Sequence, residues 1–437
     1  MMNHYLAIDI GASSGRHIVG WREGNEIKTD EVFRFPNGTK KQNNCLVWDT
    51  DSLFDNIKKG IKAAIKKYGQ IKSLAIDTWG VDYTLVNRTR TLIPCFAYRD
   101  GRTNAVIDEV HGKVPFEKLY ERTGIQYQPF NTIYQLYEDW KRGRLEAVTD
   151  FLMIPEYLNY KLTDVKMHEF TNATTTGLVN ARTGKYDREI INALGLPVHL
   201  FGKLYQPGTS VGMLKPEIAA EVGGQAEIIL CASHDTASAV EGIPMTENSP
   251  YISSGTWSLL GLKVPKAITD ESSRKANYSN EGGVGYVRYQ KNIMGMWVVN
   301  RLRDELCPEK PFPQIVEEAR QSTFNDYVDV NDSAFLAPKS MKAAFDDYLK
   351  NETIKPQNES DYFRCAFISL AISYMNALEE LKANSGADFD TLYIVGGGAK
   401  NDLLNELAEQ ICKIKVKALP IEATALGNLK QQIMRGE

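Results

Sequence analysis

A carboxylate follows a buried strand in the segment CASHDTASAV, residues 231–240, where His234, Asp235 and Thr236 precede a helical pattern. Side chains at such strand-to-helix turns are exposed and often carry function. In that position Asp235 could accept a proton from a substrate hydroxyl, while the N-terminus of the next helix stabilises negative charge. An ordinary helix start, with Asp235 or Thr236 as the N-cap and His234 in the turn, is the simpler interpretation of the tripeptide taken alone.

A second carboxylate, Asp9, lies beside a glycine-rich turn in the segment AIDIGASSGR, residues 7–16. The alternating pattern at 17–21 predicts a strand after this turn, so the turn joins two strands. That context excludes a Walker or Rossmann loop, both of which need a helix there, and the Walker lysine is also missing. Such a hairpin can still bind phosphate if Gly11 and Gly15 let backbone N–H groups point into one concavity.

The position of Asp9 indicates a metal ion. A bare carboxylate beside a phosphate-binding turn would repel the phosphate, and a cation between the two removes the repulsion. Mg²⁺ held through one carboxylate, water molecules and substrate phosphates is the usual arrangement, and Mn²⁺ could substitute. A tight hairpin with a hydrogen-bonded aspartate is the alternative for this motif alone.

Two further glycine-rich turns follow strand patterns. YISSGTWSLLG, residues 251–261, again has a Ser-Gly turn between two strands. At residues 391–413 an apolar strand ends in Gly396, Gly397 and Gly398 before a helical pattern. The two hairpins, each opening one half of the chain, suggest a duplicated phosphate-binding unit with the nucleotide between the halves. The third turn differs in kind and permits close approach of a ligand to the backbone, with a tight strand-to-helix corner as its alternative.

Two charged stretches allow a sugar site. In IDTWGVD, residues 76–82, Trp79 could stack on a sugar ring while Asp77 and Asp82 bind hydroxyls, although a buried tryptophan in a hairpin is the commoner outcome. The segment FAYRDGRT, residues 96–103, contributes Arg99, Asp100 and Arg102. Those charges fit a surface ion-pair network as well as a ligand site.

The strand and helix patterns divide the chain into two similar halves. The first half opens with strands and a helix at 51–69, which ends in lysines that suit the helix dipole. The second half has strands around 251–262 and 284–290, a helix at 292–306 and a long helix near 361–384. Gly, Pro, Asn and Ser crowd together at 243–250, which predicts the joint there.

Composition and charge exclude several classes of protein. The 437 residues suffice for two or three domains, and a hydrophobic content of 43% is that of a globular protein. A net charge of −4 with both signs interspersed argues against nucleic acid as a partner. The longest apolar stretch, 365–378, is too short to span a bilayer and predicts a buried helix. Six scattered cysteines and the lack of a leader pattern predict reduced thiols in the cytoplasm.

Several stretches between residue 9 and residue 428 match the motifs of one family. They are DIGASSGR, DTWGVDYTLV, AYRDGRT, GIQYQPFNTIYQL, TNATTTGLVN, SHDTASAV, YISSGTWSLLG, NEGG, KNIMGMW, IVGGGAKNDLLN and EATALGN. The chain therefore resembles the FGGY carbohydrate kinases, and within them it is similar to the members that phosphorylate L-rhamnulose at O1. TNATTTGLVN and KNIMGMW are the more specific stretches, because related superfamilies share the glycine turns in looser form.

The resemblance implies an α/β fold of two ribonuclease-H-like domains, as in the actin, hexokinase and Hsp70 superfamily, with the active site in a cleft between them. Residues 1–245 would form the N-terminal domain, with the sugar site and the first phosphate hairpin. Residues 246–437 would form the nucleotide-binding C-terminal domain. ATP and Mg²⁺ are the implied cofactors, and L-rhamnulose and ATP are the implied partners. We expect no nucleic acid, membrane or obligate protein partner.

The resemblance also implies roles for individual residues. Those implied to contact ATP are Ala12, Ser13, Ser14, Gly15, Arg16, Thr256, Asn300 and Gly397. Those implied to line the sugar site are Gly80, His234, Asp235, Thr236 and Asn292. Asp9 would hold Mg²⁺ through water, and Asp235 would be the proton acceptor.

Two positions depart from the family pattern. Asn300 stands where members often have glutamine, which is longer by one methylene, so its contact with the nucleotide is expected to run through water. The chain ends within a helical pattern that begins at Ala425, whereas members usually continue. This predicts a nucleotide-side domain that is unusually short or lacks a terminal segment.

Two other functions fit the same motifs. One is a kinase for another ketose or polyol, such as L-fuculose, xylulose or glycerol. The other is a non-catalytic, ATP-dependent sugar sensor or a filament-forming actin relative, which should have lost the base or the metal-side carboxylate. Asp235 and Asp9 are both present, which favours an enzyme.

Overall fold

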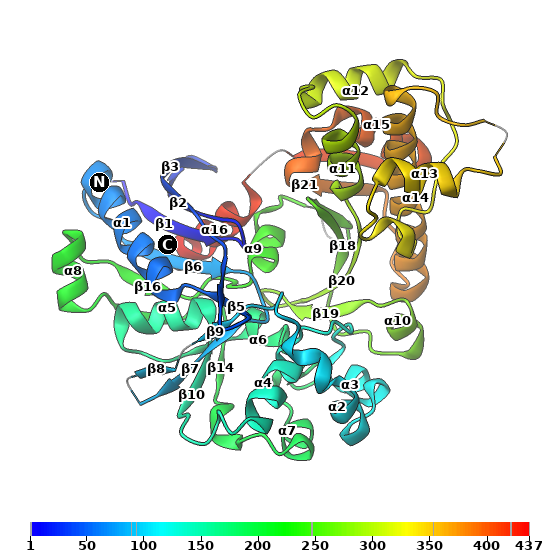
Figure 1. Cartoon of the computed structure of the whole chain (residues 1–437). Helices are drawn as coiled ribbons and strands as arrows, with labels where there is room; N and C mark the ends of the chain where they lie inside the picture. The colour runs from blue at the N-terminus through cyan, green and yellow to red at the C-terminus, as the bar shows by residue number, and fades with distance from the viewer. Residues whose placement is uncertain are drawn as a thin grey trace. The chain divides into compact units, whose positions relative to one another are not determined.

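The computed structural model describes residues 2–88, 90–92, 94–245, 248–352, 354–419 and 422–436. The chain forms two compact units (Figure 1). Unit 1 comprises Met1–Pro244, Pro265–Arg288 and Glu422–Glu437, and unit 2 comprises Met245–Val264 and Tyr289–Ile421. Neither unit is one unbroken stretch of chain. Part of the joint expected at 243–250 lies outside the described residues, at 246 and 247.

Unit 1 contains a six-stranded sheet in the order β15-β16-β6-β1-β2-β3. Its strands are β1 (Tyr5–Ile10), β2 (Ser14–Glu23), β3 (Glu26–Pro36), β6 (Ser73–Thr78), β15 (Ser210–Met213) and β16 (Glu227–Ile229). The central strand β1 pairs antiparallel with β2 and parallel with β6. Every residue of β1 and β6 is buried, so helices must cover both faces of the sheet.

The alternation of side chains along β1 sends two apolar sets to opposite faces. On one face Leu6 and Ile8 join a large core with side chains of α1 (Thr50–Tyr68) and α5 (Ile154–Thr163). On the other face Tyr5 and Ala7 pack against α16 (Ala423–Gly436), through the residues Ala425, Leu429 and Ile433. The last helix of the chain therefore completes the core of the first sheet.

The rest of unit 1 carries small sheets and short helices, some of which surround a second apolar cluster. Its strands include β4 (Thr39–Gln42), β5 (Cys45–Trp48), β7 (Tyr83–Asn87), β8 (Arg90–Leu92), β9 (Cys95–Phe96), β10 (Asp150–Met153) and β19 (Ser279–Gly282). Its helices include α2 (Ile107–Lys113), α3 (Phe116–Thr123), α4 (Thr132–Lys141), α6 (Phe170–Thr174), α7 (Arg188–Leu194), α8 (Pro216–Val222), α9 (Asp235–Gly242) and α10 (Glu271–Lys275).

Unit 2 repeats the sheet plan of unit 1. Its sheet runs β20-β18-β17-β21-β22, with β17 antiparallel to β18 and parallel to β21. The strands are β17 (Tyr251–Ser254), β18 (Trp257–Val264), β20 (Val287–Met294), β21 (Thr391–Val395) and β22 (Lys415–Leu419). In both units a hairpin opens the sheet and parallel strands extend it from the first strand of that hairpin, which confirms the predicted duplication.

The helices of unit 2 follow the predicted order with one correction. They are α11 (Trp297–Leu306), α12 (Phe312–Gln321), α13 (Met341–Tyr348), α14 (Glu359–Ser385) and α15 (Asp402–Cys412). The helix expected at 292–306 begins only at Trp297, because residues up to Met294 continue β20. The apolar stretch at 365–378 is a buried part of α14, as predicted. Among the described residues, no helix is both long and apolar enough to cross a membrane.

Candidate active site

The first hairpin brings Asp9 and Arg16 together. They face each other across β1 and β2, and Arg16 Nη2 lies 2.6 Å from Asp9 Oδ2. The guanidinium of Arg16 also pairs with Glu422, just before α16. Arg16 is thus held between two carboxylates at the end of the sheet, and its positive charge lies beside the turn that was predicted to bind phosphate.

The structure explains Gly11 and Gly15 differently from the prediction. The Gly11 N–H donates to Ser14 O at 2.9 Å, so it closes the turn rather than pointing into a concavity. Gly15 lies within β2, and a Cβ atom there would be 2.2 Å from the Phe35 ring. Its small size is therefore required by packing. Ala12 and Ser13 form the tip of the turn, and Ser14 begins β2.

Asp77 joins Asp9 and Asp235 in a group of three carboxyl groups. Asp77 is the register partner of Asp9 on the parallel strand β6. Its Oδ2 accepts a hydrogen bond from Asn428 Nδ2 of α16 at 2.6 Å, and within the described residues its buried Oδ1 has no partner. Burial raises the pKa of Asp9 to about 6, with Arg16 opposing and Asp235 adding to the rise. Burial and the neighbouring Asp9 raise the pKa of Asp77 well above its usual range.

The segment before α9 is attached to the end of β6. Thr78 forms a parallel bridge with His234, and the Thr78 N–H donates to Ser233 O at 2.9 Å. Helix α9 begins at Asp235, and His234 is its N-cap residue, so the capping alternative for Asp235 and Thr236 is wrong. Asp235 Oδ1 accepts from the Thr236 N–H at 2.5 Å. The Asp235 side chain keeps 31% of its surface exposed, which leaves it accessible to a substrate.

The buried carboxylate of Glu169 holds the segment before α9 in place. Glu169 accepts hydrogen bonds from the hydroxyl of Ser233 at 2.6 Å and from the backbone N–H groups of Thr171 and Asn172 at 2.7 and 3.0 Å. Asn172 in turn donates to Ser233 O at 3.2 Å. The start of α6 and the strand end before Asp235 are thereby fixed to each other, which explains the position of the TNATTT motif.

Gly80 lies close to His234. A Cβ atom at Gly80 would be 3.1 Å from the Thr175 side chain and 3.3 Å from His234 Nε2. The next residue, Val81, has a φ of 66°, a conformation that strains a β-branched residue by about 1–3 kcal/mol. Two hydrogen bonds hold it there: its N–H donates to Thr175 Oγ1 at 3.1 Å, and its carbonyl accepts from Thr132 Oγ1 at 2.6 Å. Strain of this kind concentrates at functional turns.

Trp79 and Asp82 have structural roles. The predictions that Trp79 stacks on a sugar ring and that Asp82 binds a sugar hydroxyl are therefore wrong. Asp82 is fully buried and accepts from the indole N–H groups of Trp48 and Trp79 at 2.6 and 3.0 Å, and from Gln135 Nε2 at 3.1 Å. Burial nevertheless raises the pKa of Asp82 to about 6. These contacts tie the strained turn to α4 and β5.

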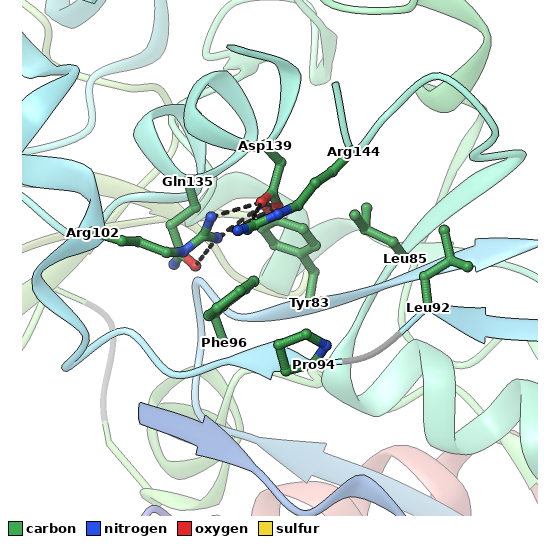
Figure 2. A pocket seen from close by; sticks show the side chains of 9 residues that line it. All are labelled: Tyr83, Leu85, Leu92, Pro94, Phe96, Arg102, Gln135, Asp139 and Arg144. Atoms are coloured by element: carbon green, nitrogen blue, oxygen red, sulfur yellow. Dashed lines mark hydrogen bonds and ion pairs between the residues drawn. The ribbon is translucent and has the colours of Figure 1, made fainter. Parts of the chain in front are cut away.

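A cavity of about 230 Å³ adjoins this network (Figure 2). The residues that line it are Tyr83, Leu85, Leu92, Pro94, Phe96, Arg102, Gln135, Asp139 and Arg144. Arg102 is buried and lies 2.7 Å from Asp139, which also pairs with Arg144 and accepts from Tyr83. The polar groups in Figure 2 are thus bonded to one another and hold α4 against β7. Arg102 belongs to a buried ion-pair network rather than to the surface network that 96–103 also allowed.

In unit 2 the second hairpin and the third glycine turn lie side by side. Gly396 has a φ of 86°, and a Cβ atom on it would be 2.7 Å from Ser254 O. A Cβ atom on Gly398 would collide with Ser254 Oγ, whereas Gly397 faces open space. Thr256 is in the hairpin turn, so Gly397 and Thr256 follow the ends of two paired strands, β21 and β17.

Asn300 and Asn292 are the remaining predicted residues. Asn300 lies in the first turn of α11 and is exposed, and α11 is attached to the hairpin by the bond from Trp297 N–H to Thr256 O at 3.1 Å. Asn292 is exposed on β20. The predicted residues thus fall into two sets, one at a sheet end of unit 1 and one in unit 2.

Comparison with known proteins identifies the family. The N-terminal domain of the FGGY family of carbohydrate kinases matches residues 4–242, and its C-terminal domain matches residues 250–435. The chain belongs to the FGGY family of carbohydrate kinases. A rhamnulokinase from Oceanobacillus iheyensis is 42% identical over 98% of this chain and 92% of its own length. A rhamnulokinase from Bacillus subtilis is 38% identical over 98% of this chain and 90% of its own length.

Solved structures of other kinases share the fold. Xylulose kinase from Lactobacillus acidophilus superposes with a TM-score of 0.82 at 15% identity, covering 99% of this chain and 89% of that one. Glycerol kinase from Plasmodium falciparum, solved with ADP, has a TM-score of 0.80 at 15% identity and covers 100% and 90%. At this identity the likeness establishes the two-domain α/β fold, which confirms the predicted fold class.

Proposed function

We propose that this FGGY family kinase transfers the γ-phosphoryl group of ATP to O1 of L-rhamnulose, giving L-rhamnulose 1-phosphate and ADP in L-rhamnose catabolism. The relatives named rhamnulokinase support the substrate, because they are about 40% identical over nearly the whole chain. The observation that carries the reaction type is the position of Asp235 at the end of the first sheet that carries the Asp9–Arg16 pair: β6 runs beside β1, and its last residue, Thr78, bridges to His234.

Asp235 is the proposed proton acceptor. In the reaction a bond forms between the sugar oxygen and the γ-phosphorus while the bond from that phosphorus to the bridging oxygen of ADP breaks. The hydroxyl proton passes to an Asp235 carboxylate oxygen. Because the transition state of phosphoryl transfer is loose, this proton moves late and Asp235 mainly orients the hydroxyl. Gly80, His234, Thr236 and Asn292 are the proposed sugar contacts.

Arg16 and the hairpin turn are the proposed phosphate contacts, together with Ala12, Ser13, Ser14 and Gly15. The guanidinium of Arg16 supplies fixed positive charge where negative charge develops. Thr256, Asn300 and Gly397 are the proposed nucleotide contacts in unit 2. Gly397 suits this role since its Cα faces open space and leaves room for a ligand against the backbone.

The carboxyl groups around Asp9 fit a divalent cation. Asp9 and Asp77 are buried neighbours whose pKa values are raised, so a cation would relieve their mutual repulsion. Within the described residues no group of three or more His, Cys, Asp or Glu side chains is arranged to hold a bare metal ion. This favours Mg²⁺ held by Asp9 through water and by the phosphates of ATP, where it would neutralise phosphate charge.

The test is ADP release by the full chain with MgATP and L-rhamnulose, beside L-fuculose, D-xylulose and glycerol. We expect release to require L-rhamnulose and Asp235→Asn to lower kcat by at least about 100-fold, the usual size of a general-base contribution. Asp51→Asn is the matched control, because it makes the same change on an exposed residue in the first turn of α1. Full activity in Asp235→Asn would contradict the role of this residue.

The same panel separates the other functions. Faster release with L-fuculose, D-xylulose or glycerol would replace the proposed substrate and keep the reaction. Tight ATP binding without sugar-dependent ADP release would favour a sensor. Light scattering that rises with protein concentration and nucleotide would favour a polymerising relative.

A further inference from the structure

The two ring nitrogens of His234 have different surroundings. Nδ1 lies 3.2 Å from Nη2 of Arg288 and 3.1 Å from Oε2 of Glu281. Nε2 lies on the other side of the ring, 3.4 Å from Thr236 Oγ1 and 3.5 Å from Asp235 Oδ1. The Nε2 edge therefore faces the proposed proton acceptor, and the Nδ1 edge faces a buried ion pair.

Arg288 is fixed independently of His234. Its side chain is fully buried, its Nε donates to Gly282 O at 3.0 Å, and its Nη2 lies 3.0 Å from Oε2 of Glu281. Glu281 is itself only 8% exposed and is part of β19. A guanidinium held at its Nε and Nη2 cannot turn away from the histidine ring, because both bonds would then break.

This geometry selects one tautomer of His234. Arginine has five N–H donors and no acceptor, so a hydrogen bond between Arg288 Nη2 and Nδ1 requires that Nδ1 accepts. In the neutral ring the proton must then be on Nε2. In the opposite tautomer, Nδ1 would carry the proton and could donate to Glu281. That N–H would then lie next to an N–H of Arg288 Nη2, and the two hydrogens would clash.

We infer that Arg288 is a positioning residue that holds His234 as the Nε2–H tautomer, directed at the sugar. The inference rests on the proposed function, which places His234 in the sugar site. An Nε2–H group beside Asp235 donates to the oxygen of the reacting hydroxyl or its neighbour, while the hydroxyl proton is accepted by Asp235. The opposite tautomer would present a lone pair to the sugar and to the carboxylate, and would lose that donor.

The first experiment reads the tautomer directly. The full chain, labelled with ¹⁵N at its six histidines, is examined by long-range ¹H–¹⁵N NMR, and the His234 signal is assigned by its loss in His234→Gln. We expect Nε2 to carry the proton in the wild type. In Arg288→Met, Glu281 can accept from Nδ1, so we expect the proton to move to Nδ1. A wild-type proton on Nδ1, or an unchanged tautomer in Arg288→Met, would overturn the inference.

Kinetics give a second readout. We expect Arg288→Met to lower kcat/KM for the sugar at least tenfold with the KM for ATP unchanged, and Arg288→Lys, which keeps a charged donor, to recover most of the loss. Equal loss in both variants, or a rise in the KM for ATP, would indicate a general structural defect and contradict the inference. Failure of the proposed substrate would appear as inactive wild type with the expected NMR tautomer, so the two hypotheses fail separately.

Two substitutions of His234 test the same inference without the Arg288 variants, which could misfold. The amide of His234→Gln places an N–H donor near the position of Nε2, whereas the shorter His234→Asn places its amide near Nδ1. We expect the glutamine variant to retain at least tenfold more kcat/KM for the sugar than the asparagine variant. Equal activity of the two variants would contradict a donor role for Nε2.

Discussion

Asp9 is a buried carboxyl group beside Asp77 and Asp235, and its pKa is raised from 3.8 to about 6, chiefly by burial. The folded state thus binds this proton more tightly than the unfolded chain does. Stability from protonated Asp9 is complete below about pH 4 and is lost as pH rises to about 6. A difference of about two pKa units corresponds to about 3 kcal/mol of unfolding free energy.

We expect Asp9→Asn to remove this pH dependence, because the amide is neutral at every pH. Between pH 4 and pH 7 the unfolding free energy of the variant should rise relative to wild type by up to about 3 kcal/mol. Urea unfolding at several pH values measures this difference. For the control Asp51→Asn, which changes an exposed residue, the unfolding free energy should vary with pH as it does in wild type. If that of Asp9→Asn varied in the same way, the raised pKa of Asp9 would be refuted. The variant should also lose kinase activity.

The packing of β2 against β3 gives Gly15 a role that the sequence alone did not indicate. A Cβ atom on Gly15 would be 2.2 Å from the Phe35 ring, which is the register partner on β3. We expect Gly15→Ala to lower the unfolding free energy by about 1–3 kcal/mol, the usual cost of overpacking. The double variant Gly15→Ala with Phe35→Leu should recover part of this loss, as measured by urea unfolding.

Gly11→Ala is the control for stability at this hairpin. The nearest atom to a Cβ there is Ser14 O at 3.6 Å, an ordinary contact, so the unfolding free energy should change by less than about 1 kcal/mol. If Gly15→Ala kept full stability and lost only activity, close approach of a ligand to the backbone would be the reason for the glycine instead.

The sequence predicted those parts of the site that depend on local pattern. The two hairpins, the third glycine turn and the strand end before Asp235 all follow from apolar runs that stop at glycine or polar residues. Asp77 was assigned to sugar hydroxyls, although LAIDI at 6–10 and LAIDT at 74–78 are nearly identical and form paired strands. That repeat was the available signal that Asp77 lies beside Asp9.

Contacts across long stretches of chain could not be predicted in this way. Arg288 reaches His234 across 54 residues, and Asn428 reaches Asp77 across 351. Neither Arg288 nor Asn428 has a local pattern that marks its partner. The burial of Arg102 with Asp139 was missed for the same reason, since charge alone suggests a surface residue.

At the scale of the whole molecule, unit 1 depends on the last residues of the chain. After the last stretch of unit 2 the chain returns to unit 1 as α16 (Figure 1). There Leu429 and Ile433 pack on the face of β1 that carries Ala7. Close approach of α16 to α9 requires glycine, because a Cβ atom on Gly427 would be 1.8 Å from Ser238 O. Helix α16 therefore supports the helix that begins with Asp235.

We expect a chain that stops after Leu419 to lose the fold of unit 1. Loss of large buried side chains costs about 2–5 kcal/mol each, and Leu429 and Ile433 together approach the whole stability of an ordinary domain. Circular dichroism on heating and limited proteolysis should then report unfolding and cleavage within residues 2–244, with no kinase activity. A chain that stops after Ile433 is the control, since it lacks only exposed side chains of α16 and should unfold close to the full-length midpoint. An unchanged midpoint in the shorter chain would mean that the parallel strands and α1 suffice for the first sheet, and would contradict a stabilising role of α16.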